Sequence, residues 1–490
     1  MTFLPFVTES ASSLAKKIRT REASSVEIVE AHLAVLLRDN PRLNVVVETR
    51  LAAARREARE ADARVAREPT STLPPLLGVP CSIKETFGLT GMHQTGGLRS
   101  RTHVRATSDA VAVARLREAG AIVLGTTNVS ELCMWMESEN RVYGRTNNPY
   151  DDTRGVGGSS GGEGAAVGAG FAPFGLGADI GGSIRIPAFM NGVFGHKPTG
   201  GLIPNAGQYP VPGPDAMRML TSGPITRRAE DLWPLVRLLS GPTSLSPEVL
   251  PIELGDPSEV SIEGLRVIDV ADNGVSRVDP SLVRAQRRLA DHLASRGARV
   301  ERVAIPALRK SVLIWSAMLA AGGSEDFAVL LGGGRRIGVT RELVRLLAGR
   351  SDFTGPSLVL AAIEEIPKHF PGNAREMVAE GLALRRELED RIGDGVMLYP
   401  GYSAPAPKHR RPWAKPIDWA YTAIFNVLEM PGTQVPLGLG PEGVPLGCQV
   451  IAPRRMDHRT VAIALEAERA FGGWVPPVSL RASPPLEQRV

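Results

Sequence analysis

The sequence predicts an α/β fold in which one large sheet is covered by helices. Short apolar runs that fit buried strands, such as AIVLG (121–125) and LRVIDV (265–270), alternate with amphipathic segments that fit helices. This alternation lies on both sides of a glycine-rich centre (155–185), and no internal repeat interrupts it. The chain has 490 residues, 43% hydrophobic and 22% charged, which is typical of a globular protein.

The first predicted helices lie before the glycine-rich centre. In REASSVEIVEAHLAVLLRD (21–39), Ser24 and Glu27 have the spacing of a capping box, and apolar residues recur at helical intervals. PPLLGVPCSIKETF (74–87) contains a short strand that ends at Lys84. A second helix is expected to begin near Ser108 or Asp109 and to end at Gly120, before the strand AIVLG.

The same succession returns after the glycine-rich centre. LRVIDV is a predicted strand, and Asp279 followed by Pro280 fits the N-cap and first position of the next helix. ARVERV (298–303) is the strand that follows it. The region 305–375 is helical and apolar, and its helices either cover the core or form the wall of a substrate pocket.

Composition excludes several classes of function. The net charge of +5 comes mainly from arginines that alternate with Glu and Ala, as in 50–68, so no basic stripe predicts a nucleic-acid partner. The three cysteines, Cys81, Cys133 and Cys448, form no C-x-x-C pair, so neither a disulfide framework nor a zinc site is expected. No apolar run is long enough for a membrane span or a signal peptide, which favours a cytoplasmic protein.

The glycine-rich centre contains GVGGSSGGEG (155–164), for which several interpretations exist. A linker is disfavoured because apolar residues are interleaved, and a phosphate loop is disfavoured because no Walker A string or preceding strand is present. G-x-S-x-G at Ser160 matches the nucleophile turn of an α/β-hydrolase esterase, but the polar NNPYDDTR before it is not a strand. The downstream histidines His369 and His458 lie in no recognisable triad context.

A second serine offers a better nucleophile. Ser183, in DIGGSIR, follows two glycines whose backbone N–H groups no side chain shields, as an oxyanion hole requires. A nucleophilic serine needs a base, and a buried lysine can serve because burial lowers the pKa of an ammonium group. Lys84 lies in a mostly apolar run and is the candidate.

At this point the chain resembles the amidase signature family of serine hydrolases. The resemblance rests on GVPCSIKETF (78–87), GGSSGGEGAAVGAG (157–170) and GLGADIGGSIRIPAFMNGVFGHKPT (175–199), in that order. TTNVSELCMWMESENRVYGRTNNPYD (126–151) and FNVLEMPGTQVPLG (425–438) support it. GGSSGGEG and KETF are similar to the fatty acid amide hydrolase branch.

The resemblance implies a fold and a domain organisation. The fold is a large mixed β-sheet with α-helices on both faces, in a single amidase domain over residues 1–490. Its parts are an N-terminal helical portion (about 1–70), a signature core (about 75–220), variable substrate-side helices (about 305–395) and a C-terminal return to the core (about 396–475).

The resemblance also implies a Ser-Ser-Lys triad that hydrolyses a small-molecule carboxylic amide to the acid and ammonia or an amine. Ser183 is then the nucleophile, Lys84 the base, and Ser159 the bridge between them, held by a cis peptide bond to the next residue. No metal or cofactor is implied, and family members suggest a homodimer. The backbone of four consecutive residues forms the oxyanion hole: Ile180, Gly181, Gly182 and Ser183.

Three further expectations follow from the resemblance. Met134 and Trp135 fall where the family places substrate-facing residues, and the bulky Trp135 favours small or aryl amides over a long lipid tail. Asp179 and Arg185 flank the nucleophile loop and are expected to form an ion pair. The alternative function within the family is the amidase subunit of a tRNA-dependent glutamine amidotransferase, which would need partner subunits.

Overall fold

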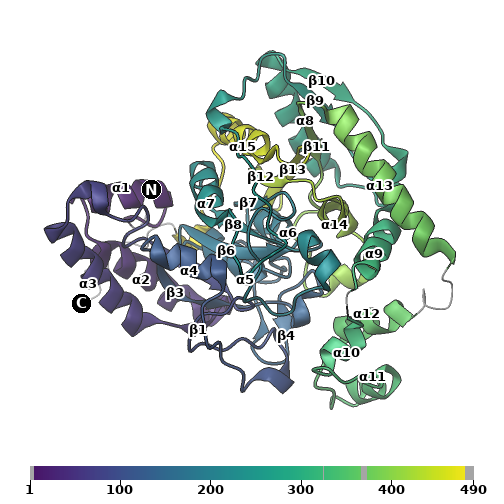
Figure 1. Ribbon diagram of the computed structural model, residues 1–490, viewed down its shortest axis with the longest axis horizontal. Helices are drawn as coiled ribbons and strands as arrows, with labels where there is room; N and C mark the ends of the chain where they lie inside the picture. Colours follow the sequence, from purple (N-terminus) through teal and green to yellow (C-terminus); the bar gives the residue numbers. More distant parts are fainter. Residues whose placement is uncertain (1–4, 324, 366–371, 481–490) are drawn as a thin grey trace.

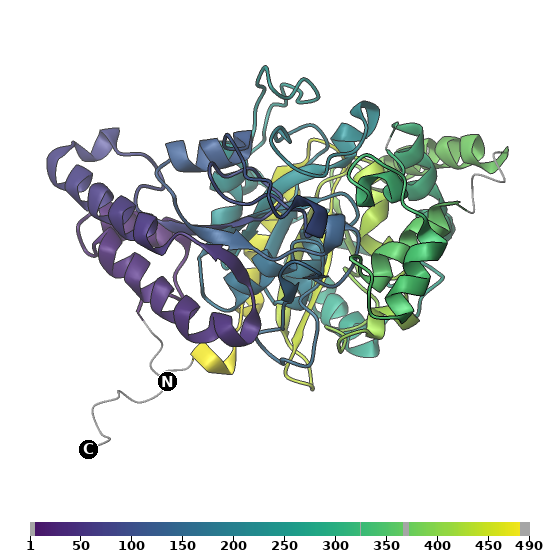
Figure 2. The same ribbon diagram turned by 90° about the horizontal axis from the view of Figure 1, so that it is seen from below.

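The computed structural model describes residues 5–323, 325–365 and 372–480, and they form the α/β fold that the sequence predicts. A mixed sheet of eleven strands in the described residues runs through the molecule, with helices on both faces (Figure 1). The α1–α3 helices lie at one end of the molecule and α9–α13 at the opposite end, and the view from below shows the same arrangement (Figure 2).

The strand order mixes parallel and antiparallel neighbours. The series β3-β2-β6 and β11-β9-β10 are parallel, and the other neighbours are antiparallel. The strands in spatial order are β1 (Val46–Thr49), β3 (Ile122–Thr127), β2 (Pro80–Lys84), β6 (Phe174–Asp179), β8 (Thr221–Thr226), β7 (Phe194–Lys197), β12 (Gly432–Leu439), β13 (Pro445–Ile451), β11 (Val396–Tyr399), β9 (Arg266–Asp269) and β10 (Arg299–Arg302). A separate hairpin joins β4 (Glu139–Asn140) and β5 (Gly144–Arg145).

The helices fall into three groups along the chain. Before and within the signature core lie α1 (Ala11–Arg19), α2 (Ser25–Leu43), α3 (Leu51–Arg67), α4 (Val111–Glu118), α5 (Gly161–Gly168), α6 (Arg185–Met190) and α7 (Leu232–Leu239). The middle group is α8 (Pro280–Ser295), α9 (Ser311–Ala321), α10 (Phe327–Leu331), α11 (Val339–Leu347), α12 (Gly355–Glu365) and α13 (Gly372–Ile392). The last group is α14 (Ala420–Val427) and α15 (Asp457–Phe471). In the described part of the chain, none of these helices has the length and apolar character that crossing a membrane requires.

Local sequence signals explain where several helices begin. Ser24 and Glu27 form the predicted capping box of α2, and Asp279 caps α8 with Pro280 in its first turn. The expected cap of α4 is wrong, because α4 begins after Ala110 and the Asp109 carboxylate instead accepts hydrogen bonds from Thr90. The Asp109 carboxylate is therefore occupied by Thr90 and does not cap the helix.

The N-terminal portion is not entirely helical. The strand β1 lies between α2 and α3 and pairs with β3 at the edge of the sheet. Its four residues give too short a pattern to be recognised between two strongly amphipathic helices. The expectation on His369 falls outside the described residues.

The glycines of the centre allow backbones to approach closely rather than giving a flexible linker. The short helix α5 is buried along its whole length. A Cβ atom on Gly162 would lie 2.5 Å from backbone atoms of Asn128, and one on Gly158 would lie 2.1 Å from the Trp135 carbonyl oxygen. This packing brings the segment that carries Ser159 against the carboxyl ends of β2 and β6.

Candidate active site

Lys84 is the last residue of β2, and its side chain is buried at the carboxyl end of that strand. Its Nζ donates to the Ser159 Oγ at 2.8 Å, with the Ala178 carbonyl oxygen at 3.5 Å. The apolar run around Lys84 thus correctly predicts burial. The contact joins residues 75 positions apart, so the sequence pattern alone could not establish it.

Ser159 lies in the turn before α5, and its peptide bond to Gly158 is cis. The cis bond therefore precedes Ser159, and the expectation that it would join Ser159 to the next residue is wrong. Gly158 at this bond lies against the Trp135 carbonyl oxygen, where a larger residue would collide.

Ser183 lies in the loop between β6 and α6, and 8% of its surface is exposed. Lys84, Ser159 and Ser183 line one cavity, so the structure brings the three predicted catalytic residues together. No hydrogen bond joins the Ser159 and Ser183 hydroxyls in the described residues, and the Ser183 Oγ has no hydrogen-bond partner there.

Ser160, the serine of the G-x-S-x-G string, has a different environment. It is fully buried, and its hydroxyl is paired with the backbone of Ala178, donating to the carbonyl at 3.2 Å. Its amide donates to the Ser183 carbonyl oxygen at 3.2 Å. Ser160 supports the loop that carries Ser183, and His458 lies elsewhere, with its ring 6.4 Å from that of Trp233.

Asp179 and Arg185 form the predicted ion pair behind the nucleophile loop. Both side chains are fully buried, with Arg185 Nη2 3.1 Å from Asp179 Oδ1 and Arg185 Nε 3.1 Å from Asp179 Oδ2. Burial alone would raise the pKa of Asp179, but the charge of Arg185 and the hydrogen bonds from Arg185 and Ile184 lower it to about 2. The carboxylate therefore stays ionised at neutral pH.

The same carboxylate changes the set of available oxyanion donors. The Gly182 amide donates to Asp179 Oδ1 at 2.7 Å in this structure, and its place in the oxyanion hole stays a prediction. The amides of Ile180, Gly181 and Ser183 donate to no acceptor in the part of the chain that the structure describes. These three N–H groups remain available to a developing negative charge.

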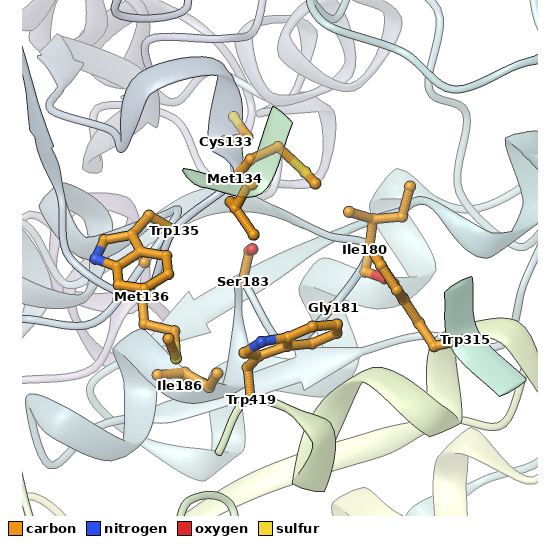
Figure 3. A pocket seen from close by; sticks show the side chains of 12 residues that line it. Cys133, Met134, Trp135, Met136, Ile180, Gly181, Ser183, Ile186, Trp315 and Trp419 are labelled. Atoms are coloured by element: carbon orange, nitrogen blue, oxygen red, sulfur yellow. The ribbon is translucent and has the colours of Figure 1, made fainter. Parts of the chain in front are cut away.

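An apolar cavity of about 80 Å³ opens beside Ser183 (Figure 3). Met134 and Trp135 both line it, as expected for substrate-facing residues. Two further indoles, Trp315 and Trp419, form its other side and contact each other edge to face, with ring centroids 4.7 Å apart. Neither was among the predicted site residues. The remaining lining residues are Cys133, Met136, Gly158, Ile180, Gly181, Ile186 and Leu360.

A second cavity, of about 110 Å³, reaches Ser183 past Met134 and Ile180. Leu319, Phe327 and Leu330, from α9 and α10, give it apolar walls, and Gln208 and Glu325 add polar groups. Of the two interpretations of the region 305–375, these cavity contacts favour the pocket wall for α9 and α10. Cys133 is half-buried and lines both cavities.

Glu163 is a buried carboxyl near Lys84. It lies on α5 and accepts hydrogen bonds from Ser82 of β2 and Thr127 of β3, both at 2.7 Å. Burial raises its pKa to about 7, although both hydroxyls and the charge of Lys84 act in the opposite direction. Among the described residues, no group of three or more His, Cys, Asp or Glu is arranged to hold a metal ion.

The chain is similar to several known proteins over most of its length. The model of the family Amidase matches residues 27–461. Fatty-acid amide hydrolase 2-B of Danio rerio is 44% identical over 96% of this chain and 91% of its own length, and fatty-acid amide hydrolase 2 of Homo sapiens is 41% identical over the same shares. The solved structure of 6-aminohexanoate cyclic dimer hydrolase superposes with a TM-score of 0.78 at 26% identity, covering 97% of this chain and 99% of that one.

Proposed function

The chain belongs to the amidase (amidase signature) family and hydrolyses carboxylic amides, and on this premise we propose that Lys84, Ser159 and Ser183 are its catalytic triad. The observation that carries the proposal is the 2.8 Å hydrogen bond between the buried Lys84 Nζ and the Ser159 Oγ, in a cavity that Ser183 also lines. Ser183 is the nucleophile and Lys84, in its neutral form, the base.

The proposed reaction has two stages, the acylation of Ser183 and the hydrolysis of the acyl-enzyme. Lys84 takes a proton from Ser159 while Ser159 takes the proton of Ser183, whose Oγ bonds to the amide carbonyl carbon. The tetrahedral intermediate expels the amine as the C–N bond breaks, and the leaving nitrogen receives a proton through the same relay. Water then attacks the carbonyl carbon of the acyl-enzyme, a proton of the water passes through the relay to the Ser183 Oγ as the bond between that oxygen and the carbonyl carbon breaks, and the acid is released. Because the Ser183 hydroxyl has no partner in the described residues, its rotation toward Ser159 breaks no hydrogen bond.

The oxyanion of the intermediate would be held by the backbone amides that remain available. Ile180, Gly181 and Ser183 supply them, and such donors act strongly because their orientation is fixed before charge develops. Asp179 contributes indirectly, because its carboxylate holds the amides of Gly182 and Ile184 and so fixes the turn of the loop.

We propose an acyl group of about the size of one aromatic ring. The first cavity is lined by the indoles of Trp135, Trp315 and Trp419, which pack favourably against an aromatic group, and its volume of about 80 Å³ leaves little room for a long acyl chain. A long acyl chain is the alternative. The names of the two relatives described above favour it, and the apolar second cavity offers it additional space.

A panel of amides tests this substrate class. For the purified protein, kcat/KM for phenylacetamide should exceed that for hexadecanamide at least ~10-fold. A methylene that fits an apolar pocket contributes about 1–3 kcal/mol, whereas the methylenes of a long chain that find no room there contribute nothing. Trp135→Ala should reduce this ratio by enlarging the cavity. Trp413→Ala is the matched control: Trp413 packs on Trp135 with ring centroids 5.6 Å apart but does not line the cavity. A wild-type preference for hexadecanamide would overturn the proposed class while leaving amide hydrolysis intact.

A homodimer and a cytoplasmic location remain part of the proposal, and light scattering and cell fractionation test them. The alternative of an amidotransferase subunit predicts that the isolated chain releases no ammonia from simple amides. We expect release without partner subunits, since the residues proposed for catalysis all lie in this chain.

A further inference from the structure

The peptide between Ile180 and Gly181 is held from outside the nucleophile loop. Its carbonyl oxygen, on Ile180, accepts a hydrogen bond of 2.8 Å from the indole Nε1 of Trp315. In a planar trans peptide the N–H points away from the C=O, so the position of this carbonyl sets the direction of the Gly181 N–H. That N–H is one of the three donors available to the oxyanion.

The carbonyls on either side of this peptide have donors of their own. Asn426 Nδ2 donates to the Asp179 carbonyl oxygen and Thr422 Oγ1 to the Gly181 carbonyl oxygen, both at 2.8 Å. Both side chains belong to α14. Trp315 differs because it belongs to α9, a helix of the substrate-side region. In the sequence, 135 residues separate Trp315 from Ile180.

Trp315 also contacts the space that substrate would occupy. Its indole lines the same cavity as Ser183, is 9% exposed, and packs edge to face on Trp419. The Trp315 side chain therefore both lines the acyl cavity and holds the peptide that carries the Gly181 N–H. Without its N–H, the Ile180 carbonyl would have no donor in the described residues, and the peptide could rotate.

We propose that Trp315 is a positioning residue for the hydrolytic reaction: its indole N–H holds the Ile180 carbonyl so that the Gly181 N–H is aimed at the oxyanion. This inference rests on the proposed function, in which that N–H stabilises the tetrahedral intermediate. It assigns the α9 helix a part in transition-state stabilisation in addition to its part in the pocket wall.

The variant Trp315→Phe tests the proposal, since it keeps an aromatic ring in the cavity and removes the donor. Trp419→Phe is the comparison, because it trims an indole of the same cavity whose Nε1 donates elsewhere, to the Pro416 carbonyl oxygen at 2.7 Å. Rates are expressed per active site, counted by fluorophosphonate titration, so that partial unfolding of a variant does not imitate a catalytic loss.

We expect Trp315→Phe to lower kcat for amide hydrolysis about 10- to 100-fold with KM changed less than ~3-fold, below the ~10²–10³-fold cost of deleting an oxyanion donor outright. Binding of an aryl trifluoromethyl ketone, which adds to the serine to form an oxyanion, should weaken by a similar factor. Trp419→Phe should change KM more than kcat.

Equal kcat losses in the two variants, or a Trp315→Phe effect confined to KM, would overturn the proposal and leave Trp315 as pocket wall only. These outcomes are separate from failure of the proposed function. That failure would appear as hydrolysis retained in Ser183→Ala, whatever the behaviour of the Trp315 variant.

Discussion

Lys84 shows how residue-level chemistry depends on a neighbour that the sequence places far away. A lysine at the end of a strand is ordinarily exposed, but here it is buried and its Nζ donates to the Ser159 hydroxyl. This contact gives the amine a proton donor and acceptor within reach, which is the geometric requirement for a base.

Replacing Lys84 separates the role of its proton from the role of its charge. Lys84→Met should lower kcat/KM for amides by at least about 10²–10⁴-fold, the contribution of a general base. Lys84→Arg should be equally impaired, because a guanidinium keeps the positive charge but does not give up its proton. Steady-state kinetics checks both variants, with thermal unfolding as the control for folding. Activity retained in Lys84→Arg would show that the charge, and not proton transfer, is required.

The sequence motifs predict some residues of the site but not all of their contacts. The motifs identify Lys84, Ser159 and Ser183, and the structure places them in one cavity. They do not show that Gly182 donates to Asp179, because hydrogen bonding in a turn follows from backbone angles, not from the residue types. Trp315 carries no motif at all, since its partner is a backbone carbonyl that any residue could provide.

The helix α5 shows at the scale of an element how a buried carboxyl can join secondary structures. Glu163 on α5 links β2 through Ser82 and β3 through Thr127, next to the strand end that carries Lys84. Its position between the glycine pair 161–162 and Gly164 was visible in the sequence, but its partners lie on two separate strands. The strand β1 and the start of α4 were missed for the related reason that tertiary contacts decide them.

The titration of Glu163 predicts a pH-dependent stability. Its pKa in the folded state is about 7 against a usual value of 4.5, so the folded state binds this proton more tightly than the unfolded state does. The resulting stabilisation is present below pH 4.5 and is lost as the pH rises to about 7, by an amount on the order of 3 kcal/mol. In Glu163→Gln this loss is absent.

Urea unfolding of both proteins between pH 5 and pH 8 measures the difference. The midpoint of the wild-type protein should fall relative to that of Glu163→Gln up to about pH 7 and then stay level. Other titrating groups are common to both proteins and cancel in the comparison. A difference that is independent of pH, or of the opposite sign, would mean that the carboxyl is not protonated when the chain is folded.

At the scale of the whole molecule, the sheet separates two regions with different relations to the site. The α1–α3 helices lie at one end, whereas α9 and α10 lie at the other and contribute Trp315, Leu319 and Phe327 to the cavities (Figure 1). The alternation of strands and helices was enough to predict an α/β sheet. The strand order was not predictable from it, because neighbours such as β7 and β12 are more than 200 residues apart in the chain.

Different parts of the molecule supply the proposed catalytic residues and the walls of the acyl cavity. The signature core supplies Lys84, Ser159 and Ser183, and the C-terminal helix α14 braces the loop that carries Ser183. The substrate-side helices shape the acyl cavity and, through Trp315, reach the same loop. We therefore expect substitutions of Leu319 or Phe327 to change which amide is preferred, while substitutions of Lys84, Ser159 or Ser183 abolish hydrolysis of every amide.

The identity of the nucleophile is the claim on which the whole account depends. Reaction of the wild-type protein with a fluorophosphonate probe, followed by peptide mapping by mass spectrometry, measures it directly. We expect one adduct on Ser183 and no labelling of Ser183→Ala. Labelling should be retained in Ser160→Ala, because the Ser160 hydroxyl is paired with the backbone of Ala178. An adduct on Ser160 or on any other residue, or full labelling of Ser183→Ala, would contradict it.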